Sequence, residues 1–268
     1  MTAQVRDDSA ASVLPFSVYA EVYDLLYADK DYAAEATFVG NLLQRFLNRA
    51  PAQIRIVDLA CGTGRHAIEL ASIGLSVTGS DVSSEMVSIA RATARERGLS
   101  IPFHIQSFQN CSAIGGKYDA ALAMFASLGY LLSPADLIQT LSCVRALLTP
   151  HGVFVFDVWN GQAVVKDYAP IREKRANNAK LTVQRISRTT LDEGAQVATV
   201  RFEFELTRRG CAPESFAEIH RVRYFFPEEL KGILEAQGFQ VLLRCPFREP
   251  SRALTPNDWN MTFVVRPA

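Results

Sequence analysis

A short apolar strand, a glycine turn and a helix follow one another without a gap, and this succession limits the fold more than any other feature. The segment Ile54–Leu59 is rich in β-branched residues, and apolar residues recur at helical spacing from Arg65 to Leu70. Gly62 and Gly64 lie between them, where glycine lets the backbone approach a ligand that a Cβ would exclude. The helix behind them presents unpaired N–H groups. Such a unit is typical of the start of a doubly wound nucleotide-binding sheet.

Asp58 indicates which kind of cofactor this turn receives. The run Gly62–Ala67 also fits the loose G-x-G-x-x-A dinucleotide pattern, so an NAD-dependent oxidoreductase is an alternative. A carboxylate at Asp58 would lie near a dinucleotide's pyrophosphate, and that like-charge contact costs energy in a low-dielectric cleft. S-adenosylmethionine has no phosphate, and negative charge stabilises its sulfonium and ammonium groups. The sequence therefore favours S-adenosylmethionine, with bonding of the loop amides as a second role for Asp58.

A second carboxylate follows the next predicted strand. Leu75–Gly79 reads as a strand, and Asp81 stands just beyond it. A carboxylate at the end of the second strand of such a sheet accepts hydrogen bonds from the ribose hydroxyls. Asp81 has an alternative role as the N-cap of the helix expected over Ser83–Arg97, which two serines also fit. The glycine turn upstream, at suitable spacing, favours the ribose role.

Two longer motifs, Val57–Gly64 and Asp81–Met86, resemble those of class I S-adenosylmethionine-dependent methyltransferases. Shorter motifs resemble the members that N-methylate nucleotide-linked amino sugars, and these are Tyr23–Tyr27, Lys30–Tyr32 and Met124–Tyr130. The resemblance covers about the first two thirds of the chain and its final strands. It implies an α/β fold with a doubly wound, mostly parallel seven-stranded sheet, and methyl transfer to a small molecule.

The resemblance also assigns cofactor contacts. They involve the methionine moiety, the ribose and the adenine, and the candidate residues are Tyr19, Tyr27, Asp58, Ala60, Gly62, Gly64, Asp81, Met86, Ser107, Phe108 and Met124. Many members carry an acidic residue where Ser107 stands, although a serine oxygen also accepts a hydrogen bond. This departure keeps open a further alternative, a methyltransferase-like binding protein that has lost catalysis.

Methyl transfer from a sulfonium is an in-line displacement that depends mainly on positioning. An amine acceptor must first lose a proton, and a hydroxyl acceptor needs a base more strongly. Tyr130 and His220 are the candidate catalytic residues, because Tyr130 follows the fourth strand and histidine titrates near neutrality. The candidate substrate-binding residues are Tyr27, Asp157, Trp159 and Arg223. An amino group of a nucleotide-linked sugar is the leading acceptor, with O-methylation of a sugar or natural product as the alternative.

Strand and helix patterns alternate through the first part of the chain, which favours a parallel sheet with helices on both faces. Helical periodicity is expected over Phe16–Tyr27 and Tyr32–Arg49. Pro227 begins a helix that ends at Gly238, with proline and glycine at their favoured ends. Two final strands, Phe239–Arg244 and Asn260–Val265, close the sheet as an antiparallel pair.

The pattern changes after Asn160. Three alternating, more charged segments indicate a small antiparallel sheet inserted after strand five, and they are Leu181–Ser187, Gln196–Thr207 and Ser215–Phe226. The expected division is a cofactor-binding core over 1–160 and 227–268 with an insert over 161–226. Because ligands bind outside the carboxyl ends of the strands, the insert is expected to roof the substrate pocket, to form a homodimer interface, or both.

Charge and cysteine usage exclude several classes of protein. Lysines plus arginines and aspartates plus glutamates both number 28, so no broad electrostatic footprint for nucleic acid is expected. The five cysteines include no C-x-x-C pair, which argues against a metal site or disulfide framework and fits reduced thiols in the cytoplasm. The most apolar run, Ala120–Leu132, is too short to span a membrane.

Overall fold

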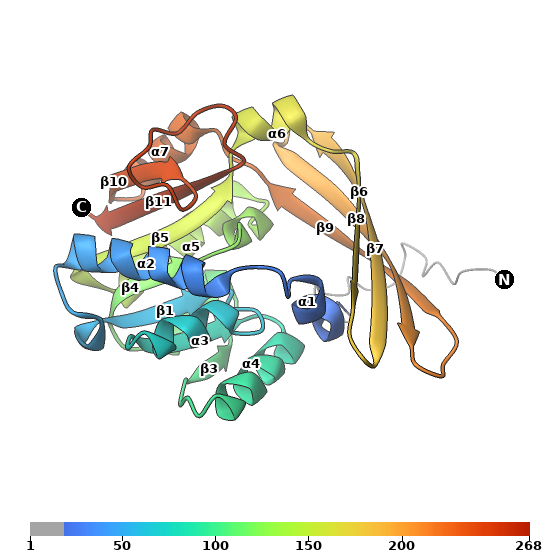
Figure 1. Ribbon diagram of the computed structural model, residues 1–268. Helices are drawn as coiled ribbons and strands as arrows, with labels where there is room; N and C mark the ends of the chain where they lie inside the picture. The colour runs from blue at the N-terminus through green and yellow to red at the C-terminus, as the bar shows by residue number, and fades with distance from the viewer. Residues whose placement is uncertain (1–18) are drawn as a thin grey trace.

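The computed structural model describes residues 19–268, so residues 16–18 of the first expected helix lie outside the described part. The core contains the glycine turn at the end of its first strand (Figure 1). Its seven strands are β1 (Arg55–Leu59), β2 (Ser76–Asp81), β3 (Phe103–Ile105), β4 (Tyr118–Ala123), β5 (Leu148–Trp159), β10 (Phe239–Pro246) and β11 (Asn260–Pro267).

The seven strands lie in the order β10-β11-β5-β4-β1-β2-β3. The pairs from β5 to β3 are parallel, and β11 is antiparallel to both β5 and β10. The chain therefore winds outward in both directions from β1 and β4, which confirms the expected sheet. The crevice at the carboxyl ends of β1 and β4 is where such sheets bind ligands.

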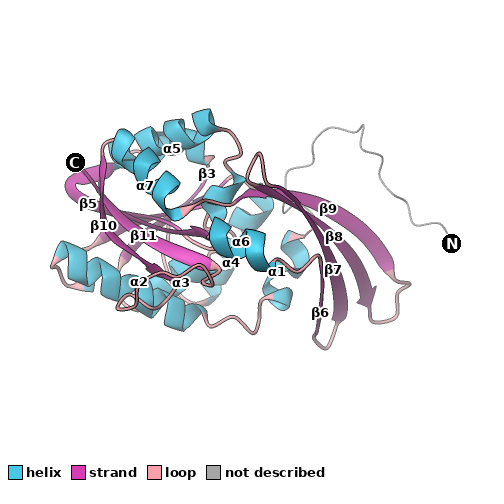
Figure 2. Cartoon of the chain, turned by 90° about the horizontal axis from the view of Figure 1, so that it is seen from above, coloured by secondary structure: helices cyan, strands magenta, loops and turns pink. Residues whose placement is uncertain are grey.

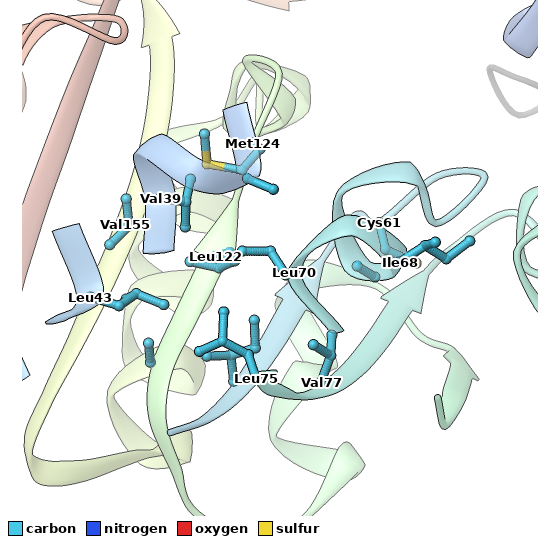
Figure 3. Close-up of a cluster of buried hydrophobic side chains, with 14 of the residues drawn as sticks. Val39, Leu43, Cys61, Ile68, Leu70, Leu75, Val77, Leu122, Met124 and Val155 are labelled. Atoms are coloured by element: carbon cyan, nitrogen blue, oxygen red, sulfur yellow. The ribbon is translucent and has the colours of Figure 1, made fainter. Parts of the chain in front are cut away.

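Helices cover both faces of this sheet (Figure 2). One apolar cluster joins one face to α2 (Tyr32–Leu47), α3 (Arg65–Ser72) and α4 (Ser84–Glu96). Figure 3 shows part of it, with Leu122, Val155 and Met124 packed near Val39. A second cluster joins the other face to α5 (Pro134–Leu147) and α7 (Pro227–Ala236). Strand residues alternate between the two clusters, as expected when both faces of a sheet are buried.

Three short 3₁₀ turns connect parts of this core, and they are η1 (Pro51–Gln53), η2 (Phe108–Ile114) and η3 (Ser127–Tyr130). The sequence indicates a turn over Thr149–Gly152 and a fifth strand over Val153–Trp159. In the structure β5 already starts at Leu148, because Leu148 pairs with Tyr118 of β4 before an irregularity in the register. The predicted start of this strand is therefore wrong, whereas its end at Trp159 is as predicted.

The segment after β5 forms α6 (Gly161–Asp167) and a separate four-stranded antiparallel sheet. Its strands are β6 (Ile171–Asn177), β7 (Leu181–Asp192), β8 (Val197–Arg208) and β9 (Glu214–Arg223). The sequence predicts three of these strands and misses β6. This edge strand is mostly exposed and rich in charge, so it lacks the alternating apolar pattern from which a half-buried strand is recognised.

The N-terminal helix α1 (Ala20–Leu26) lies between the core sheet and the β6–β9 sheet (Figure 1). Tyr19, Val22 and Leu26 pack against Phe204 and Leu206 of β8 in a third apolar cluster. Side chains of α1 thereby line the space next to the ligand-binding edge of the core. Within residues 19–268, no helix is both long and apolar enough to cross a membrane.

Candidate active site

The turn after β1 is shaped by backbone that only glycine adopts readily. Ala60, Gly62 and Gly64 all have positive φ angles, of 55°, 55° and 77°. A Cβ on Gly64 would lie 2.9 Å from the Cβ of Ala90 on α4, so this glycine permits close helix packing. A Cβ on Gly62 would meet nothing within 4 Å. The Gly62 side of the turn therefore faces open space at the carboxyl end of β1.

Asp81 holds the turn from the neighbouring strand. One of its carboxylate oxygens accepts the N–H of Gly62 at 2.8 Å, and the other accepts the N–H of Ser83 at 2.9 Å. The hydroxyl of Ser83 caps α4 by accepting the Met86 N–H at 3.1 Å, so Asp81 is not the side chain that caps this helix. Burial raises the pKa of Asp81, against the lowering effect of these amides. Each oxygen keeps a further lone pair for a ribose hydroxyl.

Asp58 is a second buried carboxyl beside the turn. It is 2 % exposed, and its Oδ2 has no hydrogen-bond partner among the described residues. Burial and the negative charge of Asp81 raise the pKa of Asp58 to about 8. A buried carboxyl of this kind becomes favourable as an anion when a cation lies next to it. Oδ2 of Asp58 therefore does not take the second role expected from the sequence, which is to accept hydrogen bonds from the loop amides.

The residues expected around an adenine lie along the edge formed by β2, β3 and β4. Met86 and Met124 are buried. Ser107 and Phe108 are half-buried at the start of η2, and Phe108 packs against the α5 cluster. Their contacts with an adenine remain predictions.

The two candidate catalytic residues meet across the two sheets. The Tyr130 hydroxyl lies 2.8 Å from Nδ1 of His220, which joins η3 of the core to β9. Glu218 lies 3.3 Å from Nε2 of the same histidine. Burial raises the pKa of Tyr130, and the charges of Tyr27, Glu218 and Asp81 raise it further. The charge of Asp81 therefore acts on Tyr130, which also contacts the insert through His220.

A cation lies among the aromatic residues of α1. The Arg185 guanidinium, from β7, donates to the hydroxyls of Tyr19 and Tyr27 at 2.7 and 3.2 Å. No acidic side chain within residues 19–268 pairs with it, and its Nε has no hydrogen-bond partner there. Arg185 is not among the site residues predicted from the sequence, because only the strand pairing brings it to the tyrosines. The sequence contains no local signal for that contact.

The helix α1 also reaches the cofactor turn. The Thr63 hydroxyl, inside the glycine turn, donates to Asp24 of α1 at 2.7 Å. Tyr27 at the end of α1 packs edge-on against Phe125, with ring centroids 5.3 Å apart. The same helix therefore contacts both the turn after β1 and the loop after β4, as expected for a segment that closes over the site.

Asp157, which the sequence predicts as a substrate contact, is hydrogen-bonded within the protein, and its contact with a substrate remains a prediction. Its two oxygens accept the backbone N–H groups of Phe125 and Ala126 at 2.6 and 3.0 Å. Both of these residues have positive φ angles, of 61° and 56°, which is costly for side chains other than glycine. Burial raises the pKa of Asp157 to about 7, despite these two amides. Asp157 thus holds the strained loop after β4 in place.

Trp159 and Arg223 also have partners within the protein. Trp159 packs edge-on against Trp259, with ring centroids 5.7 Å apart. The Arg223 side chain is buried, pairs with Glu229 at 3.0 Å and lies over the Phe225 ring. Because a carboxylate already neutralises it, Arg223 is a weaker candidate for binding a diphosphate than the sequence predicts. A sugar stacked on Trp159 remains a prediction.

S-adenosylmethionine fits the cofactor half of this geometry. Asp58 supplies an unpartnered buried carboxyl for a cationic methionine moiety, Gly62 leaves room for close approach, and Asp81 offers lone pairs to ribose hydroxyls. The candidate groups on the acceptor side, Tyr130 on η3 and His220 on β9, lie at the same edge of the core sheet. The arrangement suits transfer of a group from a bound nucleoside to a second molecule.

Comparisons with known proteins agree with this arrangement. Residues 56–152 match the family model described as a methyltransferase domain. The chain is 30% identical over 223 residues to the putative methyltransferase YqeM of Bacillus subtilis (strain 168), covering 83% of this chain and 85% of that protein. It is 27% identical over 225 residues to dTDP-3-amino-3,4,6-trideoxy-alpha-D-glucopyranose N,N-dimethyltransferase of Streptomyces venezuelae, covering 83% and 90%.

Solved structures show the same fold. Streptomyces venezuelae DesVI superposes with a TM-score of 0.77 at 24% identity, covering 93% of this chain and 98% of that one. The S-adenosylmethionine-bound amino pentose methyltransferase CalS10 from Micromonospora echinaspora superposes with a TM-score of 0.72 at 20% identity, covering 97% and 100%. Family membership decides against the NAD-dependent oxidoreductase. With the site described above, these relationships lead to one conclusion: the chain belongs to the S-adenosylmethionine-dependent methyltransferases.

Proposed function

We propose that this methyltransferase transfers a methyl group to the amino group of a nucleotide-linked sugar. Two relatives named as N,N-dimethyltransferases of dTDP-amino sugars, from Streptomyces venezuelae and Streptomyces fradiae, each align with 83% of the chain at 27% and 29% identity. They align over 90% and 84% of their own lengths. The acceptor would enter between the core sheet and the β6–β9 sheet.

The contact between Tyr130 and His220 carries the proposal. It brings a hydroxyl and an imidazole together at 2.8 Å, at the carboxyl edge of the core sheet. A sugar ammonium must lose a proton before its nitrogen can act as a nucleophile, and a hydroxyl–imidazole pair is suited to accept one. The cofactor half of the site, by itself, has no such group aimed at an acceptor.

Arg185 supports a substrate that carries a diphosphate. Its partners are the two tyrosine hydroxyls of α1, so its positive charge is not neutralised by a carboxylate within residues 19–268. Guanidinium groups bind phosphate oxygens through paired hydrogen bonds, and such charge-assisted bonds are strong. A nucleotide-linked sugar supplies the missing negative charge, and a free amino sugar does not.

The chain's own residues would perform the reaction by holding and deprotonating the acceptor. Bound S-adenosylmethionine supplies an electrophilic methyl carbon on a positively charged sulfur. Asp81 and the glycine turn would hold the cofactor, and Asp157 fixes the loop after β4 against which the acceptor would lie. Tyr130 would take the proton from the acceptor nitrogen. Positioning of this kind supplies roughly 7–11 kcal/mol toward lowering a barrier.

The insert over residues 161–226 is assigned the role of substrate roof. Its strands β7 and β9 contribute Arg185 and His220, which both contact Tyr19 at the start of α1. A homodimer through the insert remains a prediction. The cytoplasm is the proposed location, since all five cysteines are free thiols, as a reducing compartment maintains them.

Mass spectrometry of reaction products tests the proposal. Purified protein would be incubated with S-adenosylmethionine and a panel of dTDP-linked sugars, each 3-amino or 4-amino sugar paired with its 3-hydroxy or 4-hydroxy counterpart. Products heavier by one or two methyl groups are expected from the amino sugars alone. Methylation of the hydroxy sugars instead would establish the O-methyltransferase alternative. No product from any nucleotide sugar, together with firm binding of S-adenosylhomocysteine, would refute the substrate class.

A further inference from the structure

Glu218 is a buried acid at the acceptor side that the reaction described above does not use. The side chains of Glu218 and His220 are 8% and 1% exposed. One carboxylate oxygen of Glu218 lies 3.3 Å from His220 Nε2. The other accepts the backbone N–H of Tyr19 at 3.0 Å, which ties β9 to the start of α1. The carboxylate is therefore held at both oxygens.

The direction of these hydrogen bonds determines which ring nitrogen of His220 carries the proton. An ionised carboxylate only accepts hydrogen bonds, so Nε2 facing Glu218 must be the protonated nitrogen of the neutral ring. Nδ1 is then left with a lone pair, and it accepts from the Tyr130 hydroxyl at 2.8 Å. As the donor in that bond, the Tyr130 hydroxyl can still accept a hydrogen bond through its oxygen. Without Glu218 the ring could also adopt the opposite tautomer, which carries its proton on Nδ1 and cannot accept the Tyr130 proton there.

We propose that Glu218 is a positioning residue that fixes His220 in the Nε2–H tautomer and thereby makes Tyr130 and His220 a proton relay for the acceptor amine. The inference rests on the proposed function and deepens it. Asp–His pairs in hydrolases use a carboxylate in the same way, to orient an imidazole and stabilise its cation. Here the carboxylate acts through histidine on a tyrosine hydroxyl.

The number of protons is the same before and after the relay acts. One proton of the substrate ammonium moves to the Tyr130 oxygen while the Tyr130 proton moves to Nδ1 of His220. This leaves a neutral amine, a neutral tyrosine and an imidazolium paired with Glu218. The amine nitrogen then bonds to the methyl carbon, and the electron pair of the broken C–S bond stays on sulfur. The imidazolium releases its proton to solvent before a second methyl is added.

The surroundings strengthen this pairing. The His220 ring lies edge-on to Phe202 and Tyr19, with centroid distances of 4.8 and 5.9 Å. Aromatic walls exclude water, and a carboxylate stabilises an imidazolium more strongly where the local dielectric is low. Because burial disfavours ionised Tyr130, both proton transfers must be concerted. Such coupling requires His220 to be in the correct tautomer before the substrate binds.

Nitrogen-15 NMR of histidine-labelled protein tests the tautomer without any substrate. His220 is assigned by comparison with His220→Asn, since the chain has only four histidines. The spectrum of the wild type at neutral pH is expected to show an Nε2–H tautomer at His220. In Glu218→Gln the carboxylate charge is lost, and a mixture of tautomers is expected. A wild-type His220 protonated on Nδ1 would overturn the inference even if methyl transfer to amino sugars were confirmed.

Kinetics supply the second readout. For Glu218→Gln, kcat with the amino-sugar nucleotide is expected to fall roughly 30-fold, part of the roughly 10²–10⁴ that a positioned base contributes. KM and the affinity for S-adenosylhomocysteine are expected to stay within about twofold, since Glu218 is not among the residues assigned to either ligand. Glu214→Gln is the matched control, because Glu214 lies on the same strand in an exposed ion pair with Arg208. An equal loss of kcat in both variants, or none in Glu218→Gln, would refute the positioning role.

Discussion

The two halves of the site are assembled in different ways. On the cofactor side, Asp58, Gly62 and Asp81 come from one continuous stretch of β1, turn, α3 and β2, and backbone conformation does most of the shaping. On the acceptor side, side chains from α1, η3 and β9 meet, and the contact between Tyr19 and Glu218 spans 199 residues of sequence. Cofactor binding is therefore a local property of the chain, whereas acceptor chemistry depends on how the two sheets dock.

Removing one hydroxyl on the acceptor side should separate the two halves most strongly. Tyr130→Phe is expected to lower kcat by roughly 10² or more, because the proton acceptor next to the substrate nitrogen is lost. The affinity for S-adenosylhomocysteine should change less than about twofold, as judged by titration calorimetry. Tyr224→Phe is the control, since the buried Tyr224 hydroxyl has no hydrogen-bond partner among the described residues. A joint loss of rate and cofactor affinity in Tyr130→Phe would mean that the halves are not separate.

Asp81→Ala tests the cofactor half of the site, where the expected loss is in cofactor affinity. It removes the hydrogen bonds to the Gly62 and Ser83 amides and those expected to the ribose. Charge-assisted bonds are worth about 1.5–3 kcal/mol each, so S-adenosylhomocysteine should bind about 100-fold more weakly in calorimetry. Asp119→Ala is the matched control, because Asp119 also holds a backbone amide, that of Arg55, but away from the turn. Equal weakening in both variants would attribute the effect to general destabilisation.

Arg185→Met tests whether the insert contributes to binding of the nucleotide sugar. With a charge-assisted bond to the diphosphate lost, KM for a nucleotide-linked amino sugar should rise about 20-fold, consistent with about 1.5–3 kcal/mol. Cofactor affinity should not change. Arg188→Met is the control, since Arg188 lies on the same strand in an exposed pair with Glu203. An unchanged KM would remove Arg185 from the substrate site.

Taken over one pH unit, the pH dependence of cofactor binding gives the smallest expected effect. Asp58 has a pKa of about 8 in the free protein, and a cationic cofactor favours its ionised form, so its pKa falls on binding. Between pH 5 and 7, binding should therefore release a proton, and affinity for S-adenosylmethionine should rise by up to about tenfold per pH unit. Calorimetry in buffers of different ionisation heat measures that proton. Asp58→Asn should abolish it, and a wild type that releases none would contradict the assignment.

The difference between a cofactor half built from neighbouring residues and an acceptor half built from distant ones explains which features the sequence predicts. The glycine turn and both carboxylates could be identified because their function is encoded by neighbouring residues and by the spacing of strand and helix. The parallel sheet with helices on both faces followed from the same alternation, and its seven strands from the family resemblance. Tyr130 and His220 were singled out by chemistry, but nothing in the sequence indicates that they are 2.8 Å apart.

The features of the site that the sequence does not predict share a physical cause, which is contact between distant segments. Glu218 and Arg185 lie on strands of the insert, and only strand register and the docking of α1 bring them to the site. The hydrogen bonds of Asp157, at the end of β5, also depend on a distant segment, because they hold two adjacent residues with positive φ angles in another loop. Such backbone strain is invisible in the sequence when the residues are phenylalanine and alanine.

A crystal structure with S-adenosylhomocysteine and a dTDP-linked amino sugar tests the division of labour most directly. We expect Asp81 to accept both ribose hydroxyls, the diphosphate to contact Arg185, and the sugar nitrogen to lie within hydrogen-bond distance of the Tyr130 hydroxyl. The Tyr130–His220–Glu218 contacts should persist. A sugar nitrogen bound away from Tyr130, with no contact between the acceptor and the β6–β9 sheet, would contradict the assignment of acceptor chemistry to the docked sheets.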